Sequence, residues 1–311
     1  MTTPSSYEVV THAEPAMGGL LQVAITVEPE RRAAAAHAAR RAAGRVNAWA
    51  ARLTRFSDAS DLSSLNASHS STVEVRPTLA AALHWAEDAQ RRSHGVVDAT
   101  MLDQRLAAES GAAPEPVAGA RAWRIDDRGR RAVVERSHGF RFDLDGVAKG
   151  WIADRAADLL HGWPGVAVNA DGDISFHADH GVEWLVEVTD PRRPDDEPPL
   201  ATLRLGGGSG WTRNYGVATS GTSIHRWQLA DGRTTHHLID RRTGRSADTN
   251  VVQATVVAPS AREAEMIAKS AVILGSHDAY DFLTRSSAHA AILLLDSDEL
   301  IAIPGTEQWL A

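Results

Sequence analysis

Residues 141–175 combine acidic, basic and glycine residues in a spacing that suits an anionic ligand. Asp145 and Gly146 precede an amphipathic run, where they can cap and turn into a helix, and Lys149 then falls in the first helical turn. Free backbone N–H groups, the positive end of a helix and a lysine together form an anion site. Asp143 lies just upstream, where its carboxylate can meet a cation or a polar ring. This combination suits a diphosphate-containing ligand better than a hydrophobic core.

Hydrophobic periodicity and turn residues predict the elements that must position this segment. Helices are expected at residues 30–55, from Pro77 to just before Gly95, and at 261–274. Strands are expected at residues 20–27, 122–125, 132–135, 166–169, 184–189, 201–205 and 253–258, with a closing hairpin of 291–295 and 300–303. Residues 58–72, 112–119 and 206–210 are interpreted as a serine-rich loop, a linker and a flexible turn. Because strands and helices mix without strict alternation, the expected fold class is α+β.

Composition restricts the classes of protein to which the chain can belong. Its 311 residues are 43% hydrophobic, enough for a full core, and its net charge of −8 argues against nucleic acid as a partner. The absence of cysteine excludes disulfides, thiolate metal sites, cysteine nucleophiles and a lipidated cysteine anchor. The first residues have neither the basic start nor the apolar stretch of a secretory signal, and no apolar run reaches membrane-spanning length. We therefore expect a cytoplasmic protein without a membrane anchor.

Several further motifs occur in a fixed order along the chain. Together they resemble the pattern of the ApbE family, the FAD:protein FMN transferases. The matching blocks are Met17-Gly18, residues 53–66, residues 95–102, the segment 141–175, residues 217–221, residues 237–244 and residues 255–275. Each motif is weak alone, and their order and spacing carry the resemblance.

The resemblance implies a fold, a reaction and a set of site residues. The fold would be a T-fold-like, two-part α/β architecture with mixed or antiparallel sheets and the flavin between the parts, in one domain over residues 1–311. The reaction would cleave FAD, attach FMN to a Ser or Thr hydroxyl of an acceptor flavoprotein and release AMP. By resemblance, FAD contacts fall to Met17, Phe56, Asp98, Thr100, Asp143, Lys149 and Leu238, a catalytic role to His237, and a Mg²⁺ site to Gly146, Glu265 and Lys269.

Most of these residues also have an ordinary structural explanation. Asp143 and Lys149 suit a helix cap and a surface lysine, and Met17 and Phe56 suit core packing. His237 suits a histidine that bonds across a strand.

Asp98 and Thr100 likewise suit a turn carboxylate and a strand-end threonine. Asp240 is expected to organise the following turn, which contains Thr243 and Gly244.

The chain departs from the family pattern at the expected metal site. Glu265 and Lys269 stand where the family has an Asp and a Thr one helical turn apart. A protonated ammonium cannot be a metal ligand, and at this position it would repel Mg²⁺ or replace it. The two residues also have the order of a helix salt bridge, worth about 0.3–0.5 kcal/mol when exposed.

Other departures add or remove charge near the signature segment. Asp171 replaces a glycine, Arg241 replaces a proline and Gly19 replaces a threonine, while Asp145 adds a carboxylate. These changes leave open an alternative function, a transfer-inactive FAD-binding protein that acts as a carrier, a sensor or a regulator of flavinylation. A third possibility is FAD pyrophosphatase activity, with water in place of the acceptor.

Overall fold

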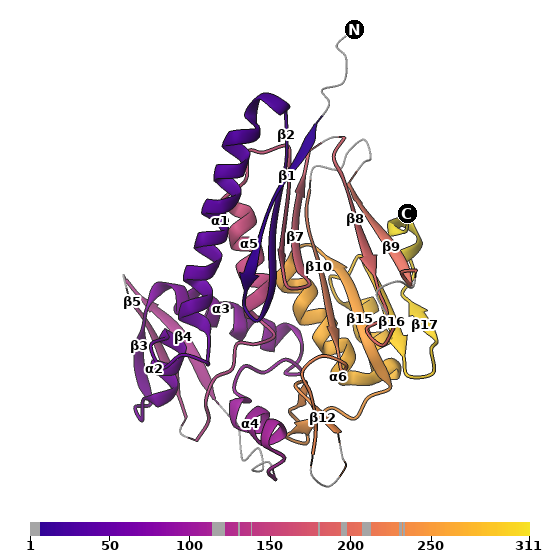
Figure 1. Cartoon of the computed structure of the whole chain (residues 1–311). Helices are drawn as coiled ribbons and strands as arrows, with labels where there is room; N and C mark the ends of the chain where they lie inside the picture. Colours follow the sequence, from indigo (N-terminus) through magenta and orange to yellow (C-terminus); the bar gives the residue numbers. More distant parts are fainter. Residues whose placement is uncertain are drawn as a thin grey trace.

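An eight-stranded antiparallel sheet forms the centre of the computed structural model (Figure 1). The structure describes residues 7–311 except 114–121, 130, 138, 180, 194–197, 207–212, 230–231 and 233. In spatial order the strands are β1 (Glu8–Ala16), β2 (Gly19–Val27), β6 (Gly165–Ala170), β7 (Asp173–Ala178), β10 (Arg213–Gly221), β15 (Val251–Ala258), β16 (Ala290–Leu295) and β17 (Leu300–Ala302). Each neighbouring pair is antiparallel, so the expected α+β class with antiparallel sheets is confirmed.

Alternating side chains give the central sheet two buried faces. In β15, Val256 belongs to the large core under the helices, whereas Val257 belongs to a second, smaller core. The helices that cover the first face are α1 (Arg32–Leu53), which follows the short η1 (Pro29–Arg31), α5 (Ala148–Asp158) and α6 (Ala261–Arg285). The opposite face carries the hairpin of β8 (Glu183–Val188) and β9 (Ala201–Gly206), with η2 (Thr306–Trp309) beside it.

A second group of elements packs beside α1, and all of them except α4 contribute to the same large core. It contains α2 (Asp61–Ala67), α3 (Pro77–Arg92), α4 (Leu102–Ser110) and a three-stranded sheet of β3 (Thr72–Val75), β5 (Arg131–Arg136) and β4 (Trp123–Arg128). Two small hairpins lie near α4, formed by β11 (Arg226–Gln228) with β12 (Thr234–His236) and by β13 (Ile239–Asp240) with β14 (Arg245–Ser246).

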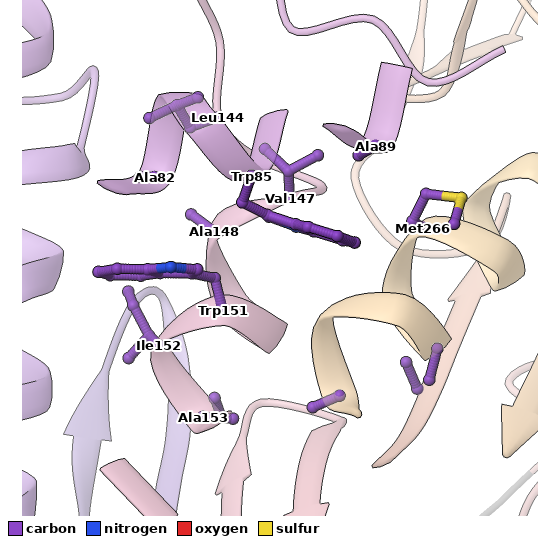
Figure 2. Close-up of a cluster of buried hydrophobic side chains, with 14 of the residues drawn as sticks. Ala82, Trp85, Ala89, Leu144, Val147, Ala148, Trp151, Ile152, Ala153 and Met266 are labelled. Carbon is purple, nitrogen blue, oxygen red and sulfur yellow. The ribbon is translucent and has the colours of Figure 1, made fainter. Parts of the chain in front are cut away.

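The start of α5 is held in place by apolar packing from three directions. Figure 2 shows Trp85 of α3, Trp151 of α5 and Met266 of α6 around this helix start. The rings of Trp49 and Trp151 meet edge to face, with centroids 6.2 Å apart. Leu144, in the turn before α5, is only 1% exposed. Because each fully buried aliphatic side chain contributes about 1.5–3 kcal/mol, this cluster fixes the turn that precedes Lys149.

A carboxylate of α5 holds the start of helix α6 against α5. Asp154 accepts the backbone N–H groups of Ala261 at 2.9 Å and Arg262 at 3.1 Å, and the N-cap residue Ser260 accepts the Glu263 N–H. These bonds satisfy N–H groups that a helix start leaves without intrahelical partners. These hydrogen bonds set the position of Glu265 and Lys269 relative to α5.

The elements predicted from periodicity are largely confirmed. The helix predicted at 261–274 ends where Gly275 adopts a φ of 75°, and the chain then resumes as a helix to Arg285. The predicted turn at 206–210 and linker at 112–119 lie mostly outside the described residues. No helix in the described part of the chain has the length and apolarity needed to span a membrane.

The prediction of a loop at 58–72 is wrong, because α2 lies within it. Ser60 caps this helix by accepting the Ser63 N–H at 2.9 Å, and Leu62 and Leu65 anchor it in the core. Strands β1, β7 and β10 and helix α4 were not predicted either. Helix α2 could not be recognised from hydrophobic periodicity, because only two residues of this short helix are buried and apolar.

Candidate active site

A cavity of about 510 Å³ lies where the second group of elements meets the start of α5. Its lining comes from the β1–β2 turn, the end of α1, α4, the first turns of α5 with the residues leading into them, and the start of β11 with the residue before it. The charged and aromatic side chains that line it are Arg55, Phe56, Arg105, Glu109, Asp143, Asp145, Lys149, His225 and Trp227. Of the residues predicted to contact FAD, Met17, Phe56, Asp143 and Lys149 line this cavity together.

Phe56 and Met17 occupy different depths of the cavity wall. Phe56 is 80% exposed, so it lies at the rim and the core-packing alternative is wrong for this residue. The guanidinium of Arg55 stacks over its ring, 4.1 Å from the centroid. Met17 is half-buried, packs against the large core and adopts a positive φ of 55° in the β1–β2 turn. An exposed aromatic ring and a partly buried thioether offer apolar contact to a flat ligand ring.

Lys149 lies in the first turn of α5, as predicted, and is surrounded by acids. Burial lowers the pKa of Lys149, but the charges of Asp173, Glu265 and Asp145 outweigh burial and raise that pKa above its ordinary value. Asp171 adds a carboxylate 3.7 Å from Lys149 Nζ. The side chain is therefore a permanent cation that faces the cavity, which fits an anionic ligand group.

Arg105 of α4 is the second cation of the cavity, and it is 4% exposed. Its Nη1 lies 2.9 Å from Asp145 Oδ2 and 3.9 Å from Asp143 Oδ2, and its Nε donates to Glu109 at 2.9 Å. Burial opposes ionisation of Asp145, but Arg105, Lys149 and the nearby Lys269 outweigh it and hold the pKa of Asp145 below its usual range. Burial and the Asp145 charge raise the pKa of Asp143, against the effect of Arg105.

His237 borders a smaller cavity of about 20 Å³ that shares Arg105, Asp143 and Asp145 with the larger one. Burial, reinforced by Lys269 and Arg105, lowers the pKa of His237 to about 3. Its ring is therefore neutral at physiological pH, and Nδ1 is buried with no hydrogen-bond partner among the described residues. The preceding His236 instead forms a hydrogen bond between Nε2 and the Ala247 carbonyl at 3.0 Å. Thus His236, rather than His237, bonds across a strand.

Three other predicted residues lie outside the main cavity. Asp98 accepts the Thr100 backbone N–H and hydroxyl, both at 2.8 Å, and its Oδ2 lies 2.9 Å from Arg241 Nε. Asp98 borders the small cavity, whereas Thr100 is fully buried beside it. Leu238 is 1% exposed and lines neither cavity. Asp240 organises the next turn as expected, because its carbonyl oxygen accepts the Gly244 N–H at 2.8 Å.

Glu265 and Lys269 do not form the exposed helix salt bridge that their spacing suggested, since Glu265 is 2% exposed and no ion pair joins the two in the described structure. Glu265 Oε2 accepts the Gly150 N–H at 3.0 Å, whereas Glu265 Oε1 and Asp173 Oδ2 are buried and have no hydrogen-bond partner among the described residues. Burial raises the pKa of Asp173 to about 7 and raises that of Glu265 well above its ordinary value. Burial therefore opposes ionisation of both carboxyl groups.

Lys269 turns instead towards the backbone before α5. Its Nζ donates to the Asp145 carbonyl oxygen at 3.2 Å, and it lies so close to Gly146 that a Cβ there would be 2.2 Å from Nζ. Gly146 also has a φ of 123°, which glycine adopts readily. Lysine at position 269 therefore fits only because residue 146 has no side chain.

A divalent cation does not fit this arrangement. Mg²⁺ takes six oxygen ligands at about 2.0–2.1 Å, whereas the amine of Lys269 fills the space beside Gly146 and donates to the Asp145 carbonyl oxygen. Within the described part of the chain, no three His, Asp or Glu residues are grouped so that they would hold a metal ion.

Comparison with known proteins now identifies the family. A family model described as the ApbE family matches residues 17–294. The chain belongs to the ApbE family.

Individual relatives are more distant. An FAD:protein FMN transferase of Treponema pallidum is 30% identical over 149 residues, which cover 44% of this chain and 39% of that protein. Another, of Salmonella typhimurium, is 26% identical over 192 residues, which cover 60% of this chain and 50% of that protein. The chain thus spans about half the length, or less, of the curated relatives it matches.

Solved structures show the same fold over nearly the whole chain. The ApbE protein of Thermotoga maritima matches with a TM-score of 0.82 at 19% identity, covering 98% of this chain and 100% of that one. The flavin transferase ApbE of Vibrio cholerae matches with a TM-score of 0.73 at 20% identity, again covering 98% and 100%. The ApbE-like architecture expected from the sequence is confirmed.

Two departures from the ApbE pattern compensate each other. Asp171 stands where the pattern has glycine, and Gly19 stands where it has threonine. A Cβ at Gly19 would lie 1.9 Å from Asp171 Oδ1, so the carboxylate occupies the space that a larger residue at position 19 would need. Asp171 in turn approaches Lys149. The two changes therefore depend on each other, and together they place an additional carboxylate beside Lys149.

Sequence reasoning missed the contribution of α4 and of the start of β11. Arg105 and Glu109 lie on a helix that was not predicted, and His225 precedes β11 and Trp227 lies within it, a strand that was not predicted either. The guanidinium of Arg105 lies 5.7 Å from the Trp227 ring centroid. The spacing of Arg105 and Glu109, one helical turn apart, was the one local signal, and it marks many exposed helices as well.

Proposed function

We propose that this chain is an FAD:protein FMN transferase, which cleaves FAD and attaches FMN to a Ser or Thr hydroxyl of an acceptor protein. The observation that carries the proposal is the cavity at the start of α5. Two cations, Lys149 and Arg105, meet there with the exposed ring of Phe56 and the thioether of Met17. A dianionic diphosphate needs fixed cations, and a flavin ring needs apolar surface. Membership of the ApbE family and the names of the relatives support the same activity.

The reaction is a displacement at the FMN-side phosphorus. The acceptor hydroxyl oxygen forms a bond to that phosphorus, the bond to the bridging oxygen breaks, and AMP leaves with the bridging oxygen. The hydroxyl proton is lost to a base or to solvent. Most of the catalysis is positioning and neutralisation of charge, as in other phosphoryl transfers.

Lys149 and Arg105 neutralise the diphosphate in this proposal, and His237 lies next to the acceptor hydroxyl. The neutral ring of His237 has a free nitrogen that can accept a proton. A bound diphosphate adds negative charge beside the ring and raises its pKa from the low value of the free protein. Asp98 and Asp143 contribute polar contacts to the nucleotide from the small cavity.

The alternative is an FAD-binding protein of the same fold that does not transfer FMN. Lys269 at the expected metal position is the observation in its favour. Both functions require FAD in the same cavity, so only turnover separates them.

The test uses the purified protein, FAD and an extract of source cells that lack the gene. In-gel flavin fluorescence and AMP release are measured together. A fluorescent protein band with equivalent AMP supports the transferase, whereas tight FAD binding without either product supports the alternative. Hydrolysis of FAD without a labelled band indicates transfer to water.

Variants of one helix test the assigned roles. Lys149→Met is expected to abolish labelling, because the only cation contributed by the start of α5 is removed. Arg155→Met is the matched control, since Arg155 is on the same helix, 54% exposed and paired only with Asp158 among the described residues. Loss of labelling in both variants, or in neither, contradicts the assignment of Lys149.

A further inference from the structure

Lysine is almost absent from this chain. Only Lys149 and Lys269 occur among its 32 Lys and Arg residues, so arginine supplies the positive charge everywhere else. Both lysines border the candidate site, one on each of the two connected cavities. A compact ammonium on a flexible stem, rather than a planar guanidinium, is therefore used only where an anionic ligand is proposed to bind.

Lys269 is built into its position by several contacts. Its Nζ donates to the Asp145 carbonyl, and the missing side chain of Gly146 makes the room that it occupies. Burial lowers the pKa of Lys269, and the charges of Asp145 and Asp143 oppose this shift by favouring the protonated amine. The remaining free volume is about 20 Å³, which is space for about one water molecule.

These contacts place a positive charge where the resemblance implies a metal. The same backbone turn and the same α6 positions would hold Mg²⁺ in the family pattern, but here they hold the Lys269 amine, and Glu265 accepts the Gly150 N–H. The positive charge of the site is thus kept while its source changes from an exchangeable ion to a side chain.

We propose that the Lys269 ammonium replaces the divalent cation in this chain, so that FAD is bound and its diphosphate neutralised without a metal. The inference rests on the proposed FAD site. Lys269 acts with Lys149 and Arg105. The carboxylate of Asp145 pairs with Arg105, and the backbone carbonyl of the same residue accepts from Lys269 Nζ.

The first test measures FAD affinity by quenching of flavin fluorescence, in EDTA and in Mg²⁺. The wild-type affinity is expected to agree within about twofold between the two conditions, because no metal takes part. Lys269→Met removes the charge at similar volume and is expected to weaken FAD binding about tenfold or more, with no rescue by Mg²⁺. An improvement of about tenfold in wild-type affinity on adding Mg²⁺ would overturn the proposal.

The second test measures metal binding directly and needs no turnover. Free Mn²⁺ is followed by electron paramagnetic resonance with the wild type and with Lys269→Thr, which restores a hydroxyl and vacates the site. The variant is expected to bind one Mn²⁺ and to make FAD affinity depend on Mg²⁺, whereas the wild type binds none. Stoichiometric Mn²⁺ binding by the wild type, or none by a folded Lys269→Thr, would overturn the proposal.

The two tests separate this inference from the proposed function. FAD binding without transfer leaves the lysine substitution intact and contradicts only the transferase activity. Failure of the wild type to bind FAD contradicts both. Circular dichroism establishes that each variant is folded, and the wild-type comparison of EDTA with Mg²⁺ decides the question if the Lys269→Met protein does not fold.

Discussion

Replacing Arg105 with methionine tests whether this buried guanidinium holds the acidic residues of the site together. The substitution keeps an unbranched side chain in the cavity wall but removes the charge. Asp145, 2.9 Å away, then loses this charged partner and Asp143 loses the nearby positive charge, whereas Glu109, also 2.9 Å away, keeps its pair with Arg55. The Arg105 side chain is 5% exposed, but that of Asp145 is 36% exposed, so water partly replaces the lost partner of Asp145.

Breaking a buried ion pair from one side costs about 3–5 kcal/mol, because it leaves an uncompensated charge. Because the Asp145 side chain is 36% exposed, and Lys149 and Lys269 still attract it in the variant, we expect a smaller loss, about 2 kcal/mol. The direction in which this stability difference changes with pH follows from the carboxyl groups. Asp145 has a lowered pKa in the folded wild type, so its stabilising contribution is present above its unfolded pKa of about 3.8 and is lost as pH falls. The difference between wild type and Arg105→Met is therefore largest near pH 7 and narrows below about pH 4.

Urea unfolding followed by circular dichroism measures this difference at several pH values. Arg52→Met is the matched control, because Arg52 is 45% exposed and its pair with Asp61 is worth at most about 1 kcal/mol. Adding Asp145→Asn to Arg105→Met is expected to recover about 1 kcal/mol or more. A loss in Arg105→Met no larger than in Arg52→Met, or a loss that does not change with pH, would refute the reasoning.

Three further predictions concern the same region and its supports. His237 has a folded pKa of about 3 against an ordinary 6.5, so the unfolded chain binds more protons between these values and stability falls as pH falls. Relative to His237→Asn, the wild type is expected to lose about 1.4 kcal/mol between pH 7.5 and 5.5 in urea unfolding, and equal losses would exclude a lowered pKa. Ser60→Ala removes the N-cap of α2 and is expected to lower the free energy of unfolding by about 1 kcal/mol, whereas Ser57→Ala changes it little. Equal effects of the two substitutions would show that Ser60 does not stabilise α2 by capping it. Gly19→Ala is expected to lower the free energy of unfolding by about 1–3 kcal/mol, because the added methyl group collides with Asp171. Adding Asp171→Gly in the same chain should restore most of this loss. A double variant as unstable as the single one would show that the two positions are independent.

The parts of the site that depend on local pattern were predictable. Lys149 could be placed in the first turn of a helix because the cap residues and the apolar repeat lie within one segment. The α+β class and most central strands also followed from hydrophobic periodicity and turn residues, whereas the antiparallel sheets were implied only by the family resemblance.

The remaining features depend on contacts between distant segments. Arg105 contributes to the site only because α4 packs against the turn 40 residues further along, and nothing near Arg105 in the sequence indicates this. The same holds for the raised pKa values of Glu265 and Asp173, which arise chiefly from burial. Lys269 was recognised as a departure from the family pattern, but its fit against Gly146 is visible only in three dimensions.

The most direct test of the central claim is mass spectrometry of an acceptor after incubation with the protein and FAD. The account predicts a Ser or Thr carrying FMN through a phosphodiester, one AMP released per modified residue, and no labelling by Lys149→Met. Bound FAD that yields neither AMP nor a modified Ser or Thr would contradict the account and identify the chain as a flavin-binding protein.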